Sequence, residues 1–167
     1  CCFKKAERSF AQIRCFSTGE LAGYGVAINL DTGEVSAPYS TGFTGGAAWA
    51  ESLGDGWFRL ILTFITDTEA AFTTYLLPAQ SLTTSSPAYI GDGSSGVYIW
   101  GAQCELAQNP ANPQPTDYIP TTSATVTVAS QPRLVPGRGQ LIEGARTNLC
   151  LRSQEFDNAS WTKSNVT

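Results

Sequence analysis

Tyr98 and Trp100 are the side chains of this sequence whose type and spacing best suit a binding surface. They alternate with Val97 and Ile99 in GVYIWGAQCE, residues 96–105. In a β-strand this alternation places both rings on one face, about 7 Å apart, so that a sugar ring can stack across them. The alternative is that both rings lie in the hydrophobic core, where aromatic side chains contribute much of the buried area. Their position inside a regular strand favours the core.

Trp57 and Trp49 extend the set of candidate glycan-binding residues. Trp57 follows the turn GDG and shares a strand face with Arg59, which favours a position near solvent. Trp49 stands between small residues in GGAAWAES. Both also have a structural interpretation, which the sequence favours: Trp57 belongs to the core, and Trp49 holds a loop against the body of the protein.

Asp92 in GDGSSG and Asp55 in GDGW are candidate calcium ligands, because carboxylate oxygens in loops bind this ion. Neither aspartate has the regular ligand spacing of a calcium loop. An aspartate in a turn also accepts hydrogen bonds from backbone amides two residues later, which accounts for both residues without a metal. We therefore expect no cofactor, with a structural calcium ion at Asp92 or Asp55 as the weaker alternative.

The residue types that support catalysis are missing or isolated. The chain of 167 residues has no histidine, so a serine or cysteine nucleophile lacks its usual base. The five cysteines show no CxxC spacing, which argues against a zinc site. Cys104 and Cys150 stand where a strand favours an aliphatic residue, and we expect them to be reduced and buried. The sequence predicts a protein without enzymatic activity.

The charge distribution argues against nucleic-acid binding. The net charge is −4, and residues 15–132 contain ten acidic side chains but only one basic side chain, Arg59. Such a surface repels phosphate backbones. The sequence also lacks a run of about 20 apolar residues, the length of a membrane-spanning helix. We expect neither a nucleic acid nor a membrane among the partners.

Composition and local pattern predict an all-β protein. The chain is 14% charged and contains 16 glycines and 9 prolines, without a long helical period. The expected strands are residues 10–16, 24–30, 57–65, 71–77, 97–106 and 124–129. Residues 31–33 predict a hairpin turn, residues 41–48 a loop and residues 130–140 a linker. This number of strands favours a two-layer antiparallel β-sandwich of jelly-roll type with an extended C-terminal segment.

Three strands carry more specific predictions. The continuous apolarity of residues 57–65 indicates a central strand that is covered on one face and partly on the other. Phe58, Leu60, Leu62 and Phe64 share one of these faces. Pro78 is expected to end the strand at residues 71–77, because proline has no N–H to donate. Uninterrupted alternation in residues 97–106 places on one face Tyr98, Trp100, Ala102 and Cys104.

Four stretches of the chain together resemble a known family. They are GDGWFRLILTF at 54–64, GDGSSGVYIWGAQCE at 91–105, PTDYIPTT at 115–122 and GARTNLCLRSQEFDNASWTKSNVT at 144–167. The set resembles the concanavalin-like, or carbohydrate-binding-module-like, jelly-roll domains of structural proteins in tailed bacteriophages. Modules of that family open with an ARTNLL element and close with YIWGAQLE and TSYIPT elements. In this chain the closing elements come first and the opening element comes last.

The inverted order has two explanations. In the first, residues 1–129 are a jelly-roll β-sandwich that lacks its opening strands, residues 130–143 are a linker, and residues 144–167 open a following module. In the second, residues 144–167 complete the sheet of the same fold. Because the chain also begins at Cys1 rather than at a methionine, we expect it to be an internal piece of a longer polypeptide.

The resemblance implies a structural protein of a phage virion, in a fibre or a capsid decoration, that assembles in the cytoplasm of the bacterial host. The expected partners are other virion proteins, copies of the chain itself and host-surface polysaccharide, which many copies bind weakly but multivalently. One alternative is a carbohydrate-binding module of a secreted glycan-active protein. Another is a purely structural cement or stalk protein without a ligand, and a depolymerase is more distant.

Overall fold

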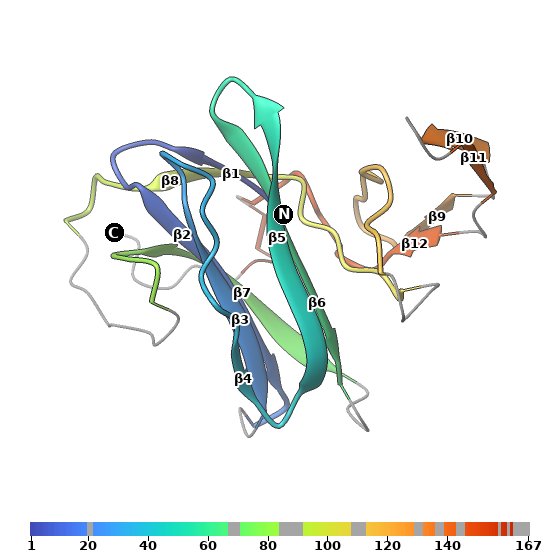
Figure 1. Ribbon diagram of the computed structural model, residues 1–167, viewed down its shortest axis with the longest axis horizontal. Coiled ribbons are helices and arrows are strands. Elements are labelled where there is room, and N and C mark those ends of the chain that lie inside the picture. Colours follow the sequence, from blue (N-terminus) through green and yellow to red (C-terminus); the bar gives the residue numbers. More distant parts are fainter. Residues whose placement is uncertain are drawn as a thin grey trace. The chain divides into compact units, whose positions relative to one another are not determined.

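Every regular element in the described part of the chain is a β-strand (Figure 1). The computed structural model describes residues 1–19, 22–66, 71–83, 92–107, 113–128, 132–135, 139–142, 146–156, 158–159 and 161. The strands are β1 (Cys2–Lys5), β2 (Phe10–Ser17), β3 (Gly23–Asn29), β4 (Tyr39–Thr41), β5 (Thr44–Gly54), β6 (Trp57–Ile65), β7 (Phe72–Ala79), β8 (Val97–Trp100), β9 (Val126–Val128), β10 (Pro132–Val135), β11 (Gly139–Ile142) and β12 (Arg146–Asn148). Among these residues there is no helix that could cross a membrane.

The chain divides into two compact units, with the boundary between Ile99 and Trp100. The first unit contains two four-stranded sheets, with the strand orders β5-β6-β1-β8 and β4-β3-β2-β7. The strand pairs whose register is defined run antiparallel. The first unit therefore confirms the predicted all-β, antiparallel β-sandwich, while its jelly-roll connectivity remains a prediction.

The two sheets enclose a hydrophobic core that follows the alternation of the sequence. Ala11, Ile13 and Cys15 of β2 point inward, as do alternate residues of β3. Buried side chains from both sheets form one cluster: Phe3, Ala11, Ile13, Cys15, Val26, Ile28, Leu30 and Leu60.

β6 is the central strand that its apolar sequence predicts, because it lies between β5 and β1. The face that carries Phe58, Leu60, Leu62 and Phe64 points inward: Leu60 is buried in the cluster, and the other three pack against it. Tight turns follow two of the strands, β3 and β5. The predicted turn at residues 31–33 includes a hydrogen bond from Gly33 N to Asn29 O, 2.7 Å long, and the β5–β6 hairpin turns through Gly54, Asp55 and Gly56, all with positive φ.

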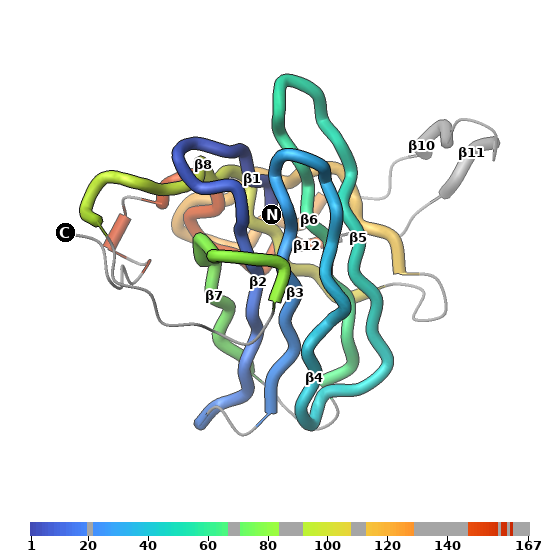
Figure 2. Tube along the Cα trace, turned by 60° about the vertical axis from the view of Figure 1, so that its left-hand side comes forward, coloured from blue at the N-terminus to red at the C-terminus, as the bar shows by residue number. Residues whose placement is uncertain are grey.

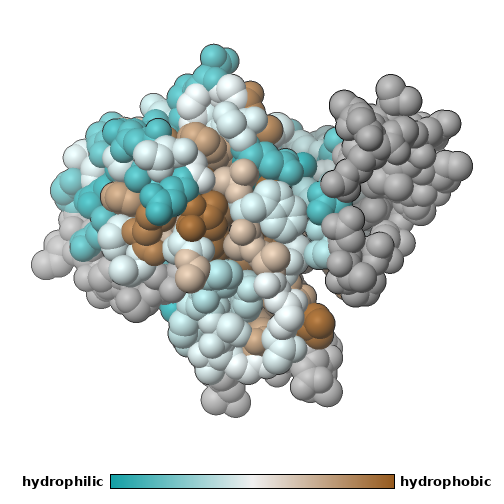
Figure 3. Space-filling view, viewed as in Figure 1, coloured by the Kyte–Doolittle hydropathy of each residue, from teal (hydrophilic) through white to brown (hydrophobic). Residues whose placement is uncertain are grey.

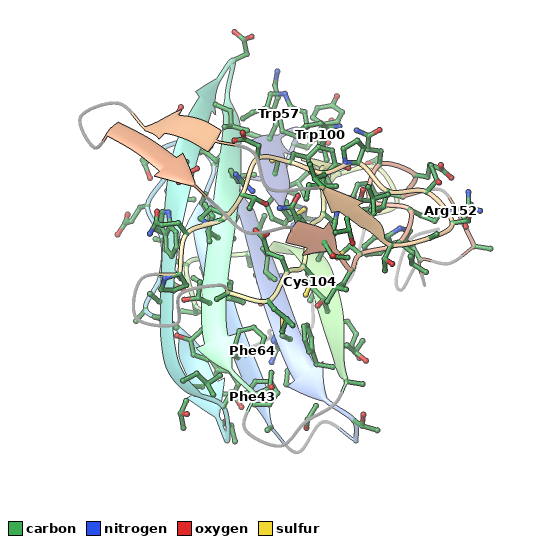
Figure 4. The ribbon with its side chains drawn as sticks, turned by 90° about the vertical axis from the view of Figure 1, so that its right-hand side faces the viewer. Phe43, Trp57, Phe64, Trp100, Cys104 and Arg152 are labelled. Atoms are coloured by element: carbon green, nitrogen blue, oxygen red, sulfur yellow. The ribbon has the colours of Figure 1, made fainter. Side chains whose placement is uncertain are left out.

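Aromatic rings fill one end of the sandwich, where Figure 4 shows Phe43 and Phe64 close together. Phe64 stacks on Phe43 and Tyr24, with ring centroids 5.2 and 5.5 Å apart. Gly46 passes next to Tyr24, and a Cβ at this position would clash with the Tyr24 hydroxyl and with a β6 carbonyl. The glycines of TGFTGG therefore allow a close approach between strands.

Residues 41–48 are mostly strand, so the predicted loop is wrong. β5 begins at Thr44, and its ladder with β6 contains a register shift between Thr44 and Ala47. Glycine in a strand commonly marks such a bulge, and Gly45 has a φ of 52°. The composition that predicts a loop here belongs instead to an irregular strand (Figure 2).

Two other local predictions also differ from the structure. β7 continues through Pro78 to Ala79, because β7 is an edge strand and the missing N–H of a proline is tolerated there. In the segment predicted to be a linker, β10 and β11 form an antiparallel pair with Val135 opposite Gly139. Pro132 belongs to β10 and Gly139 to β11, so a proline and a glycine of that segment are part of strands.

Gln12 provides a test of polar burial in the sandwich. Its side chain is 3% exposed, on the face of β2 that points away from the core, and its Oε1 has no hydrogen-bond partner. An unpaired buried polar atom costs free energy that an apolar side chain of similar shape recovers. We predict that Gln12→Leu raises the free energy of unfolding by about 1 kcal/mol, measured by urea denaturation.

The matched control is Gln103→Leu, because the Gln103 amide is hydrogen-bonded through both its oxygen and its nitrogen. This variant should lower the free energy of unfolding. If Gln12→Leu destabilises the protein as Gln103→Leu does, Gln12 Oε1 is bonded to an ordered water and is not an unpaired atom.

Candidate functional site

β8 exposes two aromatic rings because its other side chains belong to the sandwich. Val97 and Ile99 pack against the hydrophobic cluster, so alternation directs Tyr98 and Trp100 to the opposite side of the strand. Tyr98 is 59% exposed and Trp100 is 39% exposed. The interpretation of these rings as core residues is therefore wrong.

The exposed face ends at Trp100 because Gly101 changes the direction of the backbone. Gly101 has a φ of 64°, in the left-handed region that glycine adopts readily. The strand predicted over residues 97–106 therefore stops at Trp100. Ala102 is buried and does not share the exposed face of Trp100, contrary to the uninterrupted alternation expected from the sequence.

In the second unit, the ring of Tyr118 lies against Trp100. The two ring centroids are 4.7 Å apart and the ring planes are inclined by 52°. The Tyr118 hydroxyl lies 2.6 Å from Ser153 Oγ in a hydrogen bond, and Ser153 is fully buried. Trp100, labelled in Figure 4, is thus one half of an angled aromatic pair whose other ring is anchored to a buried group.

Two side chains of GAQCE fix the segment that carries Tyr118. Gln103 accepts a hydrogen bond from Ile119 N at Oε1 and donates one from Nε2 to Thr116 Oγ1, each 2.8 Å long. Glu105 accepts hydrogen bonds from Thr116 N and Thr116 Oγ1, also 2.8 Å long. The motifs GAQCE and PTDYIP are therefore two extended segments joined by side-chain hydrogen bonds, and the Glu105 carboxylate has a structural role.

Asn148 joins these two segments to the late part of the chain. It is fully buried, its Nδ2 donates to Ile119 O at 2.8 Å and to Ala102 O at 3.3 Å, and its Oδ1 accepts from Cys104 N at 3.2 Å and Cys150 N at 3.0 Å. The amide thereby uses its complete hydrogen-bonding capacity. These bonds lie within the second unit, and the predicted domain boundaries stay predictions.

Ser153 and Thr121 form a second buried connection. Ser153 Oγ accepts a hydrogen bond from Thr121 N at 3.0 Å, and Ala102 N donates to Ser153 O at 3.2 Å. The Thr121 hydroxyl also bonds to Cys150 O. These contacts hold Ser153 in the position from which it bonds to Tyr118, so the late segment sets the orientation of the half-buried Tyr118 ring beside Trp100.

Trp49 and Trp57 lie outside the sandwich core, both half-buried. Their strand neighbours Ala50 and Phe58 face the core, and alternation therefore places the two tryptophans on the outer face of the sheet. Trp49 is part of β5 and does not hold down a loop, and the core interpretation of Trp57 is wrong as well.

The structure does not bring Trp49 and Trp57 together. In the β5–β6 ladder Trp49 lies opposite Ile61, and Ile61 is separated from Trp57 by about 13 Å of strand. Trp49 Nε1 donates a hydrogen bond to Glu51 Oε1, 3.3 Å away. Within the first unit these two rings are separate surface positions and not one aromatic platform.

Asp92 accepts hydrogen bonds in a turn, as the sequence predicts. Its Oδ1 accepts from Ser94 N at 3.0 Å and Ser95 N at 2.7 Å, and its Oδ2 accepts from Ser95 Oγ at 2.6 Å. The hydrogen bond from the Ser95 side chain, then those from the two amides, hold the pKa of Asp92 well below its usual range.

Asp55 has a φ of 50° in the exposed β5–β6 turn. Among the described residues, no three His, Cys, Asp or Glu side chains form a group suited to a metal.

The cysteines form no disulfide in the structure, since all five are free thiols. Cys104 and Cys150 are half-buried, less than the sequence predicts. Burial raises the pKa of the Cys150 thiol, which keeps it protonated and poorly nucleophilic at neutral pH.

Comparisons with protein-family models, with curated proteins and with solved structures find no match to this chain. The candidate site therefore rests on its own geometry. The sequence analysis missed Tyr118, whose ring lies against Trp100. The prolines on both sides of Tyr118 in PTDYIP indicate that its backbone is held in one conformation. Nothing in the sequence indicates which ring Tyr118 contacts.

Asn148 provides a direct test of the polar network. We predict that Asn148→Leu lowers the free energy of unfolding by about 3 kcal/mol, because it leaves two amides and two carbonyls in the network without their partner. Urea denaturation followed by tryptophan fluorescence measures the loss. The control is Leu149→Ala, an exposed neighbour, for which we expect a change of about 0.5 kcal/mol or less. Equal effects of the two variants would show that the network contributes little.

The lowered pKa of Asp92 predicts that the stability of the protein depends on pH. Because the folded pKa of Asp92 lies below the unfolded value of about 3.9, its stabilising effect is complete above that value and is lost as pH falls through the lower, folded pKa. Asp92→Asn should therefore be less stable than the wild type at pH 6, with a difference that shrinks below about pH 4. Denaturant unfolding at several pH values measures this difference. A difference that is constant down to pH 2.5 would contradict the role of the carboxylate.

Proposed function

We propose that this chain is a non-enzymatic β-sandwich module of a tailed-bacteriophage virion, in a fibre or a capsid decoration, that binds host-surface glycan through Trp100 and Tyr118. The observation that carries the proposal is the exposed Trp100 ring beside an anchored Tyr118 ring. The phage setting and the jelly-roll assignment are supported by the sequence motifs at 54–64, 91–105, 115–122 and 144–167.

The geometry suits stacking of a sugar ring on tryptophan. One side of Trp100 lies toward Tyr118, and the tilt of 52° between the rings leaves an angled surface instead of a flat ladder. Because the Tyr118 hydroxyl is bonded to Ser153, the pair is ordered before a ligand arrives, which reduces the entropic cost of binding.

The chemistry of the chain favours a neutral glycan and weak binding. A net charge of −4 repels acidic polysaccharides. A surface of few rings makes a small contact, so useful attachment comes from many copies on one virion that engage a repeating polysaccharide together. Other virion proteins and copies of this chain are the partners that supply this multiplicity.

The structural roles of two carboxylates support a non-enzymatic function. Glu105 is hydrogen-bonded to Thr116, and Asp92 to Ser94 and Ser95. Glycoside hydrolysis needs a pair of carboxyl groups about 5 to 9 Å apart with distinct acid and base roles. Carboxylates that are committed to turns and segment contacts are poor candidates for those roles.

A purely structural cement or stalk protein is the second candidate, favoured by one observation. The second unit exposes several aliphatic side chains, Leu106, Val126, Val128, Leu149 and Leu151. On the face shown in Figure 3, hydrophobic side chains of the described residues form separate small patches. A neighbouring virion subunit would cover such positions and no glycan would be needed.

Titration of the purified chain with neutral polysaccharide from candidate host bacteria tests the proposed function. We predict saturable binding, seen by tryptophan fluorescence and calorimetry, that Trp100→Ala weakens at least tenfold. Tyr118→Phe keeps the ring but removes the hydroxyl that bonds to Ser153, and should weaken binding less. Trp49→Phe is the matched control, since Trp49 lies on a different strand, and it should bind as the wild type does.

Two outcomes would decide against the glycan site. If Trp100→Ala folds and binds with unchanged affinity, the ring pair is not the binding surface. If no polysaccharide binds, while the chain associates with another virion protein, the structural cement is the better function.

A further inference from the structure

β5 differs from the other edge strands of the sandwich. The two sheets end in β5, β8, β4 and β7. β4 has three residues and β8 has four, while β7 contains Pro78. Shortness and proline both protect an edge against pairing with another chain. β5 has eleven residues and contains neither proline nor lysine.

The outer edge of β5 presents backbone groups in a regular order. Leu60 N donates a hydrogen bond to Cys1 O, and Leu60 O accepts one from Cys1 N. Cys1 directly precedes β1, which pairs with β6 on the side opposite β5. The N and O of Leu60 therefore point away from β5. Ala50 lies opposite Leu60, so the two residues form a non-hydrogen-bonded pair of the β5–β6 ladder. The N and O of Ala50 therefore point away from β6, toward the outer edge of the sheet. Alternation gives the N and O of Ala48 the same direction, whereas the N and O of Ala47 both bond to the side-chain hydroxyl of Thr63 in β6.

We propose that β5 of one chain pairs antiparallel with β5 of a second copy, with Trp49 on the two-fold axis. In this register Ala48 of one copy lies opposite Ala50 of the other, and each such pair exchanges two backbone hydrogen bonds. The ladder is regular from Ala47 to Ser52, between the two register shifts of β5. The paired edges would join two four-stranded sheets into one.

The side chains around the axis fit a second copy. Ala48 and Ala50 are small and face the core of their own sandwich, so they leave the outer edge accessible. Glu51 is the single charged residue of β5, and the register places it opposite Ala47 instead of a second Glu51. The two Trp49 rings meet as a non-hydrogen-bonded pair, in which side chains approach most closely.

The inference goes beyond the proposed function and does not depend on it. Pairing through β5 uses no residue of the Trp100–Tyr118 surface. A short strand contact buries less area than a standard stable interface, so we expect a reversible dimer at micromolar or higher concentrations. If the glycan site is also correct, each dimer presents two copies of it.

Sedimentation velocity of the whole chain, up to several hundred micromolar, tests the dimer. The wild type should dimerise reversibly, and Trp49→Lys should weaken the dimer at least tenfold, because two like charges then face each other across the axis. Thr73→Lys is the control, since it adds the same charge to an exposed position of another edge strand. It should dimerise as the wild type does.

A cross-linking experiment keeps the proposal testable if Trp49→Lys fails to fold. In a non-hydrogen-bonded pair the Cα atoms are about 4.5 Å apart, within the range that a disulfide spans. Under oxidation, Trp49→Cys should form a covalent dimer linked between the two positions 49, identified by mass spectrometry, whereas Leu53→Cys, exposed but away from the axis, should not. A wild type that stays monomeric, or a dimer that both lysine variants retain, would overturn the proposal. Both results leave the glycan titration unaffected.

Discussion

A single buried amide connects the three segments of the second unit. Asn148 bonds to Ala102 and Cys104, which precede it by 46 and 44 residues, to Ile119, which precedes it by 29, and to Cys150. A buried amide that lacks partners is costly, so the segments either meet together or leave several polar groups unpaired. This condition makes the arrangement around Tyr118 all-or-none, and the exposed ring pair depends on it.

The two units are stabilised by different physical means, and this explains which one could be predicted. In the sandwich, alternate apolar residues of β2, β3 and β6 are buried in the core cluster or pack against it, and a period of two is readable in a single sequence. In the second unit, side-chain hydrogen bonds of Gln103, Glu105 and Asn148 join irregular segments. Which donor meets which acceptor follows from tertiary structure and leaves no period in the sequence.

The candidate site also depends on contacts that a single sequence does not predict. Alternation correctly placed Tyr98 and Trp100 on one side of their strand, but whether that side was buried depended on Val97 and Ile99 facing the core. Gly101 ended the strand with a positive φ, an outcome that glycine permits but does not require. Tyr118 follows Trp100 by 18 positions, and only the folded chain brings the rings together. Glycines at 45 and 46 likewise marked a bulge in β5 where composition predicted a loop.

The hydrogen bond between Tyr118 and Ser153 also orders events in time. A ribosome delivers Trp100 first, Tyr118 next and Ser153 last, and chains are synthesised at about 5 to 20 residues per second. The sandwich strands β1 to β7 are therefore complete for several seconds before the residue that anchors the ring pair has been made. A nascent chain thus contains the sandwich strands early and the anchor of its aromatic pair late, and a chain truncated before Ser153 lacks the hydroxyl to which Tyr118 bonds.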